Sequence, residues 1–193
     1  MEKLRVLYLI DKLEVAGAQR HLVALLKGMD RSRFEPSVIC LMQEGSLAQE
    51  IRSLGIPVRS LRVRRIYGVS GILGLMKLVR FLKRERVDIL HAYLFSENIL
   101  GSVAGCLAGT RMVITGRRDT GKLREGKGRH FFAYRLTNRW VDRIVCKSEA
   151  VKRVVLEREA PPKEKVVTIL NGAQAEPSLS PELRPLLAHI RRR

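Results

Sequence analysis

Seven short apolar runs divide this chain at regular intervals, and polar turns separate them from the segments between. Their residues are rich in Val, Ile and Leu, which favour β-strands. The runs cover residues 5–10, 37–41, 58–61, 87–91, 112–115, 143–146 and 166–170. Near-continuous apolar composition over so few residues is typical of strands that are buried on both faces of a parallel sheet.

Between these runs, apolar residues recur every three or four positions, which is the period of an amphipathic helix. Such stripes lie in residues 22–29, 47–54, 72–82, 131–141 and 149–156, and residues 98–107 are small and apolar. The small residues suit a helix that packs closely on a sheet. Strands that alternate with helices predict an α/β fold: a doubly wound, mostly parallel, Rossmann-like sheet of about seven strands with helices on both faces.

We expect this domain to cover residues 1–172. Residues 173–193 contain three prolines and end in three arginines. They are predicted to be a linker or tail toward a further domain.

The charge of the chain changes the picture. Its 193 residues hold 37 Lys and Arg against 19 Asp and Glu, for a net charge of +18. Such an excess indicates an anionic partner: nucleic acid, anionic lipid or a phosphorylated substrate. Residues 59–86 and 116–130 hold most of it and begin at the carboxyl ends of predicted strands, where open α/β sheets bind ligands. Only 5% of the residues are aromatic and no known module is recognisable, which disfavours nucleic acid.

The helix predicted at residues 72–86 has two possible uses. Its stripe is formed by Ile72, Leu75, Met76, Val79 and Leu82, beside Lys77, Arg80 and Arg84. Such a stripe can be buried in the core, which is the commoner arrangement. It can also rest on an anionic bilayer with its cations toward the headgroups.

The cysteines and the apolar windows bear on location. Cys40, Cys106 and Cys146 are an odd number and each lies in an apolar run, so we expect buried free thiols in a reducing compartment. The first apolar run is too short for a signal peptide, and no window reaches the roughly 20 apolar residues of a membrane span. The expected location is cytoplasmic, including the inner face of the cytoplasmic membrane. No metal site is expected.

The first strand runs through a polar loop into a helix that opens at Gly17-Ala18. Small residues let a ligand approach the backbone, and a helix start offers free N–H groups and a positive dipole end to an anion. A tight turn packed on the sheet is the alternative. No Gly-x-Gly-x-x-Gly follows this strand, which disfavours a dinucleotide-dependent oxidoreductase.

Five stretches share an order and a spacing with one known family. They are Ala16-Gly17-Ala18-Gln19; His91 to Phe95 with Asn98 and Gly101; Thr115 to Asp119; Arg143 to Val151; and Val167 to Gly172. Together they resemble the N-terminal domain of glycosyltransferase family 4, which are retaining enzymes with the GT-B fold. The resemblance spans roughly residues 4 to 172.

Three departures qualify the resemblance. Ala16 stands where the family usually has its first glycine, and Gln174 where it often has Asp. The resemblance does not extend to the family's C-terminal domain, which binds most of the sugar nucleotide and supplies a pair of glutamates. Glu149 and Glu157 have the spacing of that pair but lack its glycine-rich surroundings, so we assign them to a solvated face.

The resemblance implies a glycosyltransferase of hexosyltransferase type, whose donor is a UDP- or GDP-sugar and which holds no bound cofactor. It implies that Gly17, Ala18 and Gln19 face the donor phosphates and that His91 is the catalytic candidate, hydrogen-bonding the sugar or acceptor. The alternative for His91 is a structural histidine that caps the next helix. The remaining candidates are acceptor or anion ligands and a hinge between domains. They are Arg117, Arg118, Lys122 and Asn98 for the ligands, and Asn171 and Gly172 for the hinge.

The resemblance also implies partners and a role. The acceptor would be a sugar or a lipid-linked molecule, in cell-envelope polysaccharide or glycolipid synthesis, with the C-terminal domain of the same polypeptide as partner. The chain alone would be inactive. The alternatives are a non-catalytic half-protein that binds an acceptor or an anionic membrane, and a nucleic-acid-binding domain.

Overall fold

A computed structural model describes residues 2–63, 68–118 and 128–171 of the chain. Seven parallel strands form one sheet in the order β3-β2-β1-β4-β5-β6-β7. The strands are β1 (Leu4–Ile10), β2 (Phe34–Cys40), β3 (Val58–Ser60), β4 (Ile89–Ala92), β5 (Met112–Arg117), β6 (Arg143–Cys146) and β7 (Val166–Thr168). The predicted doubly wound α/β sheet is confirmed, and every strand pairing in it is parallel.

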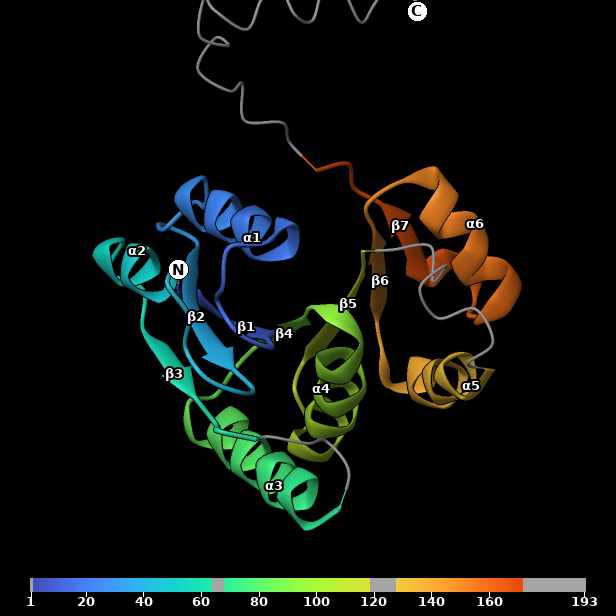
Figure 1. The fold of residues 1–193 in the computed structure, drawn as a ribbon, viewed down its shortest axis with the longest axis horizontal. Helices are drawn as coiled ribbons and strands as arrows, with labels where there is room; N and C mark the ends of the chain where they lie inside the picture. The colour runs from blue at the N-terminus through green and yellow to red at the C-terminus, as the bar shows by residue number, and fades with distance from the viewer. Residues whose placement is uncertain (1, 64–67, 119–127, 172–193) are drawn as a thin grey trace, which may run out of the picture.

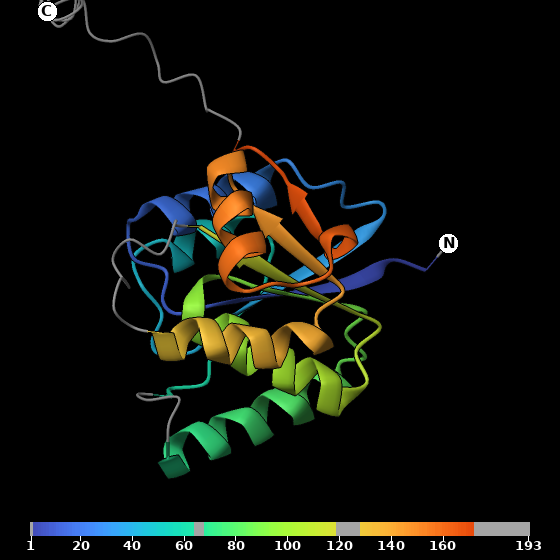
Figure 2. The ribbon, with the colours of Figure 1, turned by 90° about the vertical axis from the view of Figure 1, so that its right-hand side faces the viewer.

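Helices cover both faces of this sheet (Figure 1). They are α1 (Gly17–Lys27), α2 (Ala48–Ser53), α3 (Gly68–Arg84), α4 (Leu94–Ala108), α5 (Gly128–Thr137) and α6 (Glu149–Arg158), with short 3-10 turns η2 (Asn138–Trp140) and η3 (Lys163–Lys165). The views in Figures 1 and 2 place α1 and α2 on one side of the central strands, and α3 and α4 on the other.

The central strand β1 is buried on both faces. Val6, Tyr8 and Ile10 pack with α1 and α2, whereas Leu7 and Leu9 face the opposite way and pack with α3 and α4. This alternation follows from the two-residue period of a strand. It explains why the sequence of β1 is apolar at almost every position.

Helix α4 lies close to the sheet because two of its residues have no side chain. A Cβ atom at Gly105 would lie 2.5 Å from Cγ2 of Val113, and one at Gly101 would lie 3.1 Å from Cβ of Ala92. Real Cβ atoms do not make contacts as short as the first of these. The expectation that small residues at 98–107 serve close packing agrees with this geometry.

Two expectations about burial hold only in part. Helix α3 buries Gly71, Gly74, Leu78 and Leu82, while Ile72 and Met76 from the predicted stripe are exposed. Gly74 lets this side of α3 pack closely, because a Cβ atom at Gly74 would overlap the side chain of Val63. Cys40 and Cys146 are buried free thiols as expected, but Cys106 lies on the exposed side of α4.

The strand order reverses between β1 and β4. From β1, the strands β2 and β3 are added toward one edge of the sheet, and β4 to β7 are then added toward the other edge. In open α/β sheets, such a switch point leaves a crevice at the carboxyl ends of the two central strands, and ligands bind there. A ligand site is therefore expected at the carboxyl ends of β1 and β4.

Candidate functional site

Four rings gather at this switch point. Tyr8 of β1 and His91 of β4 are partners in the strand register, and their ring centroids lie 5.5 Å apart. Tyr93, just beyond β4, lies 4.8 Å from His91, and His21 of α1 lies 6.2 Å from Tyr93. The sequence indicated His91 alone, because a tyrosine in a strand and a histidine in a helix suggest core residues when their neighbours are unknown.

Arg118 brings a positive charge to these rings from the end of β5. Its guanidinium carbon lies 4.5 Å from the centroid of Tyr93, and its Nη2 lies 2.8 Å from Nδ1 of His21. Its Nη1 donates to Oδ1 of Asn171 at 3.1 Å. Among the residues described, no carboxylate forms an ion pair with Arg118. Within the described ranges the cation is held in place by neutral groups, and no carboxylate there compensates its charge.

The two histidines of the cluster are neutral at neutral pH. Burial lowers the pKa of His91 to about 3, with the charges of Arg118 and His21 adding to the effect. Burial, and then Arg118, lowers the pKa of His21 to about 4. A guanidinium can only donate hydrogen bonds, so Nδ1 of His21 is the acceptor and its proton lies on Nε2.

Nε2 of His91 is withdrawn from solvent and meets no hydrogen-bond partner in the described part of the chain. Buried polar atoms are nearly always paired, so at the switch point this nitrogen is available to the hydrogen-bonding group of a ligand or of water. Gly116 leaves room beside it, because a Cβ at this glycine would lie 4.0 Å from Nε2.

These pKa values predict how stability depends on pH. In the unfolded chain both histidines bind a proton near pH 6.5, whereas in the folded chain they do so near pH 4 and pH 3. The unfolded state therefore binds more protons in the interval, and the free energy of unfolding falls as the pH decreases from 7 to 5. Urea unfolding at these two pH values measures the fall. The His21→Gln/His91→Gln variant is expected to lose most of it; an undiminished fall would refute the assignment.

The start of α1 is open to an anion. Ala16 precedes it in extended conformation, no side chain caps its first N–H groups, and its first turn holds no acidic residue. Gly17 is exposed, and a Cβ there would meet nothing within 4 Å, so packing does not require this glycine. Gln19 has a different role: it is buried and its Nε2 donates to Oδ1 of Asp11 and to the carbonyl of Lys12. It fixes the loop that precedes the helix.

Arg117 does not lie beside Arg118 in an anion clamp, because consecutive strand residues point to opposite faces. It is 5% exposed, and its Nη2 lies 2.9 Å from Oε2 of Glu159 and 3.0 Å from Oδ1 of Asn138. Burial is the largest single influence and lowers the pKa of Arg117, but Glu159, Tyr134 and Cys146 together outweigh burial and raise it. Its guanidinium also lies over the ring of Tyr134 at 3.7 Å. Arg117 thus has a structural ion pair in place of the expected role.

The other sequence candidates have separate places. Asn98 is 1% exposed, and its Nδ2 donates to the carbonyl of Gly116 at 2.7 Å, so it positions the strand end that carries Arg118. Asn171 meets Arg118 directly. Lys122 and Gly172 lie outside the described residues. Glu149 and Glu157 are both exposed on α6, in agreement with a solvated face.

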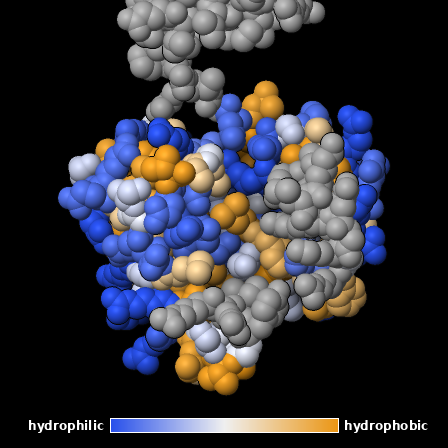
Figure 3. Space-filling view, viewed as in Figure 1, coloured by the Kyte–Doolittle hydropathy of each residue, from blue (hydrophilic) through white to orange (hydrophobic). Residues whose placement is uncertain are grey.

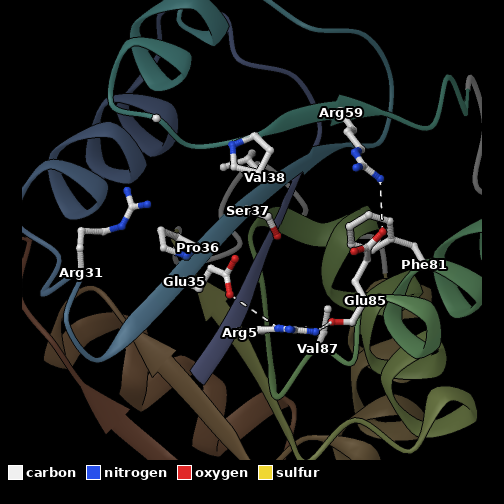
Figure 4. Close-up of a pocket in the computed structure, with 12 residues that line it drawn as sticks. Arg5, Arg31, Glu35, Pro36, Ser37, Val38, Arg59, Phe81, Glu85 and Val87 are labelled. Atoms are coloured by element: carbon white, nitrogen blue, oxygen red, sulfur yellow. Dashed lines mark hydrogen bonds and ion pairs between the residues drawn. The ribbon is translucent and has the colours of Figure 1, made fainter. Parts of the chain in front are cut away.

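A pocket of about 250 Å³ lies at the opposite edge of the sheet, near the amino ends of β1 and β2 (Figure 4). Four of its five charged side chains are paired: Arg5 lies 3.6 Å from Glu35, and Arg59 lies 3.6 Å from Glu85, while Arg31 donates to the carbonyl of Leu54. Since these charges compensate one another and the pocket lies away from the switch point, it does not belong to the candidate site.

Two further observations concern the described residues as a whole. Across residues 2–63, 68–118 and 128–171, no group of three or more His, Cys, Asp or Glu is placed to hold a metal ion. Within those same ranges, none of the helices has the length and apolar character needed to traverse a bilayer.

Solved structures of other proteins share this fold. HepE (Alr3699) of Anabaena, in complex with UDP and glucose, is 21% identical with a TM-score of 0.72, and the match covers 95% of this chain and 50% of that one. A glycosyltransferase of Rickettsia africae is 16% identical with a TM-score of 0.68, covering 100% and 50%. MurG of Acinetobacter baumannii is 14% identical with a TM-score of 0.59, covering 91% and 47%. The chain thus spans about half the length of these proteins. No curated protein sequence matches it.

Fold and neighbours together define a Rossmann-like domain that corresponds to one half of the GT-B fold. Residues 15–176 match the family described as Glycosyltransferase Family 4. The chain belongs to glycosyltransferase family 4, and the resemblance stated from its sequence is confirmed.

Proposed function

We propose that this chain is the acceptor-side domain of a retaining glycosyltransferase that moves a sugar from a UDP- or GDP-sugar to an acceptor. The observation that carries the proposal is that two available groups lie at the switch point. Among the described residues, the charge of Arg118 has no carboxylate partner and Nε2 of His91 has no hydrogen-bond partner. Family membership supports the reaction class, and the UDP complexes of HepE support the donor class.

The roles we propose follow from charge. Cleavage of the donor places negative charge on the leaving diphosphate, which positive groups and N–H dipoles stabilise. The uncapped start of α1 at Gly17 and Ala18 supplies dipoles, and Arg118 supplies a full charge. His91, neutral at working pH, exchanges a hydrogen bond with a hydroxyl of the sugar or acceptor.

The finer parts of the proposal concern the whole enzyme. A second domain, joined through a hinge at Asn171 and Gly172, holds most of the donor, and this chain alone transfers no sugar. Residues 1–172 form the domain and residues 173–193 the linker. The acceptor is a sugar or lipid-linked molecule at the cytoplasmic face of a membrane, in polysaccharide or glycolipid synthesis. The excess of basic residues supports an anionic surface or substrate.

The test is transfer by the complete reading frame that contains this sequence. UDP or GDP release is measured with UDP- and GDP-sugars and a membrane lipid extract as acceptor, and NMR gives the anomeric configuration of the product. We expect release that depends on the extract, a retained configuration, and no release by residues 1–193 alone. Absence of release from every donor would favour the non-catalytic binding half-protein.

A further inference from the structure

The outward face of α3 exposes four large apolar side chains. Val69 is 73% exposed, Ile72 60%, Leu73 53% and Met76 63%. At about 100° per residue, these positions fall on one side of the helix. Figure 3 shows apolar side chains at the lower edge of the molecule, where Figure 1 places α3. A contiguous apolar patch of this kind marks an interaction surface.

This face is not a core face that lacks its partner. The opposite side of α3 is buried through Gly71, Gly74, Leu78 and Leu82, and Leu78 and Leu82 belong to the same core cluster as Leu7 and Leu9 of β1. The helix is therefore already packed on the sheet. Its exposed apolar residues are additional to those that fold the domain.

The same face turns from apolar to basic along the helix. Lys77, Arg80, Lys83 and Arg84 are exposed after Met76, and α3 contains no acidic residue. Arg84 meets Glu85 at 2.7 Å just beyond the helix, whereas the other three have no carboxylate partner within the described ranges. Apolar residues in the first half and cations in the second half make the face suited to an acyl layer bordered by anionic headgroups.

We propose that the outward face of α3 docks on an anionic lipid bilayer, with Val69, Ile72, Leu73 and Met76 inserted and the basic second half at the headgroups. The helix would lie tilted, its amino-terminal half deeper. Charge complementarity decides the occupant: a net charge of +18 and an α3 without acids match an anionic lipid surface. The last described residues, just past β7, lie on the far side of the molecule from α3 (Figures 1 and 2), so they do not cover this face.

This surface deepens the proposed function by naming the face that would bring the enzyme to a membrane acceptor. It is tested without donor or acceptor, so its failure and the failure of the transfer proposal are distinguishable. The protein is floated with vesicles of phosphatidylcholine alone or with phosphatidylglycerol. We expect binding to the anionic vesicles, release in high salt, and little binding to neutral vesicles.

Paired variants locate the surface. Ile72→Ser/Met76→Ser and Lys77→Glu/Arg80→Glu are each expected to lower the bound fraction by about tenfold or more. The matched controls change exposed residues elsewhere: Leu25→Ser on α1 and Arg153→Glu/Lys163→Glu around α6 are expected to bind like the parent. Circular dichroism confirms that each variant is folded.

A depth measurement tests the tilt. In a Trp140→Phe background, a Met76→Trp reporter is expected to be quenched by brominated acyl chains more strongly than a Lys83→Trp reporter. No binding to anionic vesicles, or equal loss in the α3 variants and the controls, would overturn the proposal. Equal quenching would overturn the tilt. An altered oligomeric mass with unchanged lipid binding would assign the face to a protein contact instead.

Discussion

Replacing Glu159 with alanine is expected to lower the free energy of unfolding by about 3–5 kcal/mol, because it leaves the buried guanidinium of Arg117 without its counter-ion. Both side chains are nearly inaccessible, at 5% and 3%, and Nε of Arg117 also donates to Glu159 at 3.0 Å. Asn138 and Tyr134 also contact Arg117, but neither side chain has a carboxylate. Urea unfolding at pH 7 measures the loss.

Two variants distinguish this effect from general damage to the region. Glu157→Ala removes an exposed carboxylate from the same helix and is expected to change stability by less than about 0.5 kcal/mol. Arg117→Met/Glu159→Leu removes both charges and is expected to recover most of the loss, since apolar residues can replace a buried ion pair. A Glu159→Ala protein as stable as the parent would show that the ion pair is not closed to water.

Replacing Arg118 with alanine in the complete enzyme is expected to lower kcat/KM by about 100-fold or more, equivalent to about 2.7 kcal/mol of transition-state stabilisation. This expectation depends on the proposed function. The physical reason is that Arg118 is held against Tyr93, His21 and Asn171 without a carboxylate partner in the described ranges, so its charge is available to an anion. Initial rates of nucleotide release measure the change.

The controls separate charge from placement. Arg118→Lys keeps the charge but loses the planar group that lies over Tyr93, so we expect a partial loss. Arg143→Ala removes an exposed arginine from the amino end of β6, at the other edge of the sheet, and is expected to keep the parent rate. Full activity of the Arg118→Ala enzyme would contradict a role for this residue in the site. A loss of activity explained by a lower free energy of unfolding of the variant would contradict it as well.

The strands could be predicted from the sequence because each lies within a short run rich in β-branched and apolar residues, and the central strand β1 is buried on both faces. All seven predicted strands overlap a strand in the structure. The strand order was not predictable from the runs alone, although a switch between β1 and β4 is usual for alternating strands and helices. The tight packing of α4 was predictable as well, since its small residues allow close approach.

The site was predictable only in part, because it is built from residues that are distant in the sequence. The pattern marked His91 and Arg118 at strand ends, but nothing local indicated that His21 would meet Arg118 97 positions later. The separation of Arg117 from Arg118 depends on where β5 ends and which face each position takes. Glu159 was missed because its partner, Arg117, lies 42 positions away in the sequence. The available signal was that Glu159 is an acidic residue at the carboxyl end of a helix, where acids are unfavourable without a cationic partner.

The hydrogen bond from Arg118 to Asn171 makes ligand binding and chain geometry reciprocal. Nη1 of Arg118 cannot serve Asn171 and an incoming phosphate oxygen with the same proton at once. A ligand oxygen that takes the proton now donated to Asn171 would break that bond, and a movement of Asn171 would free the proton for the ligand. By linkage, the two effects are equal in free energy: the position of Asn171 changes the affinity for the ligand by the same amount as the ligand changes the equilibrium between positions of Asn171. One arginine would thereby serve as a sensor of whether the site is filled.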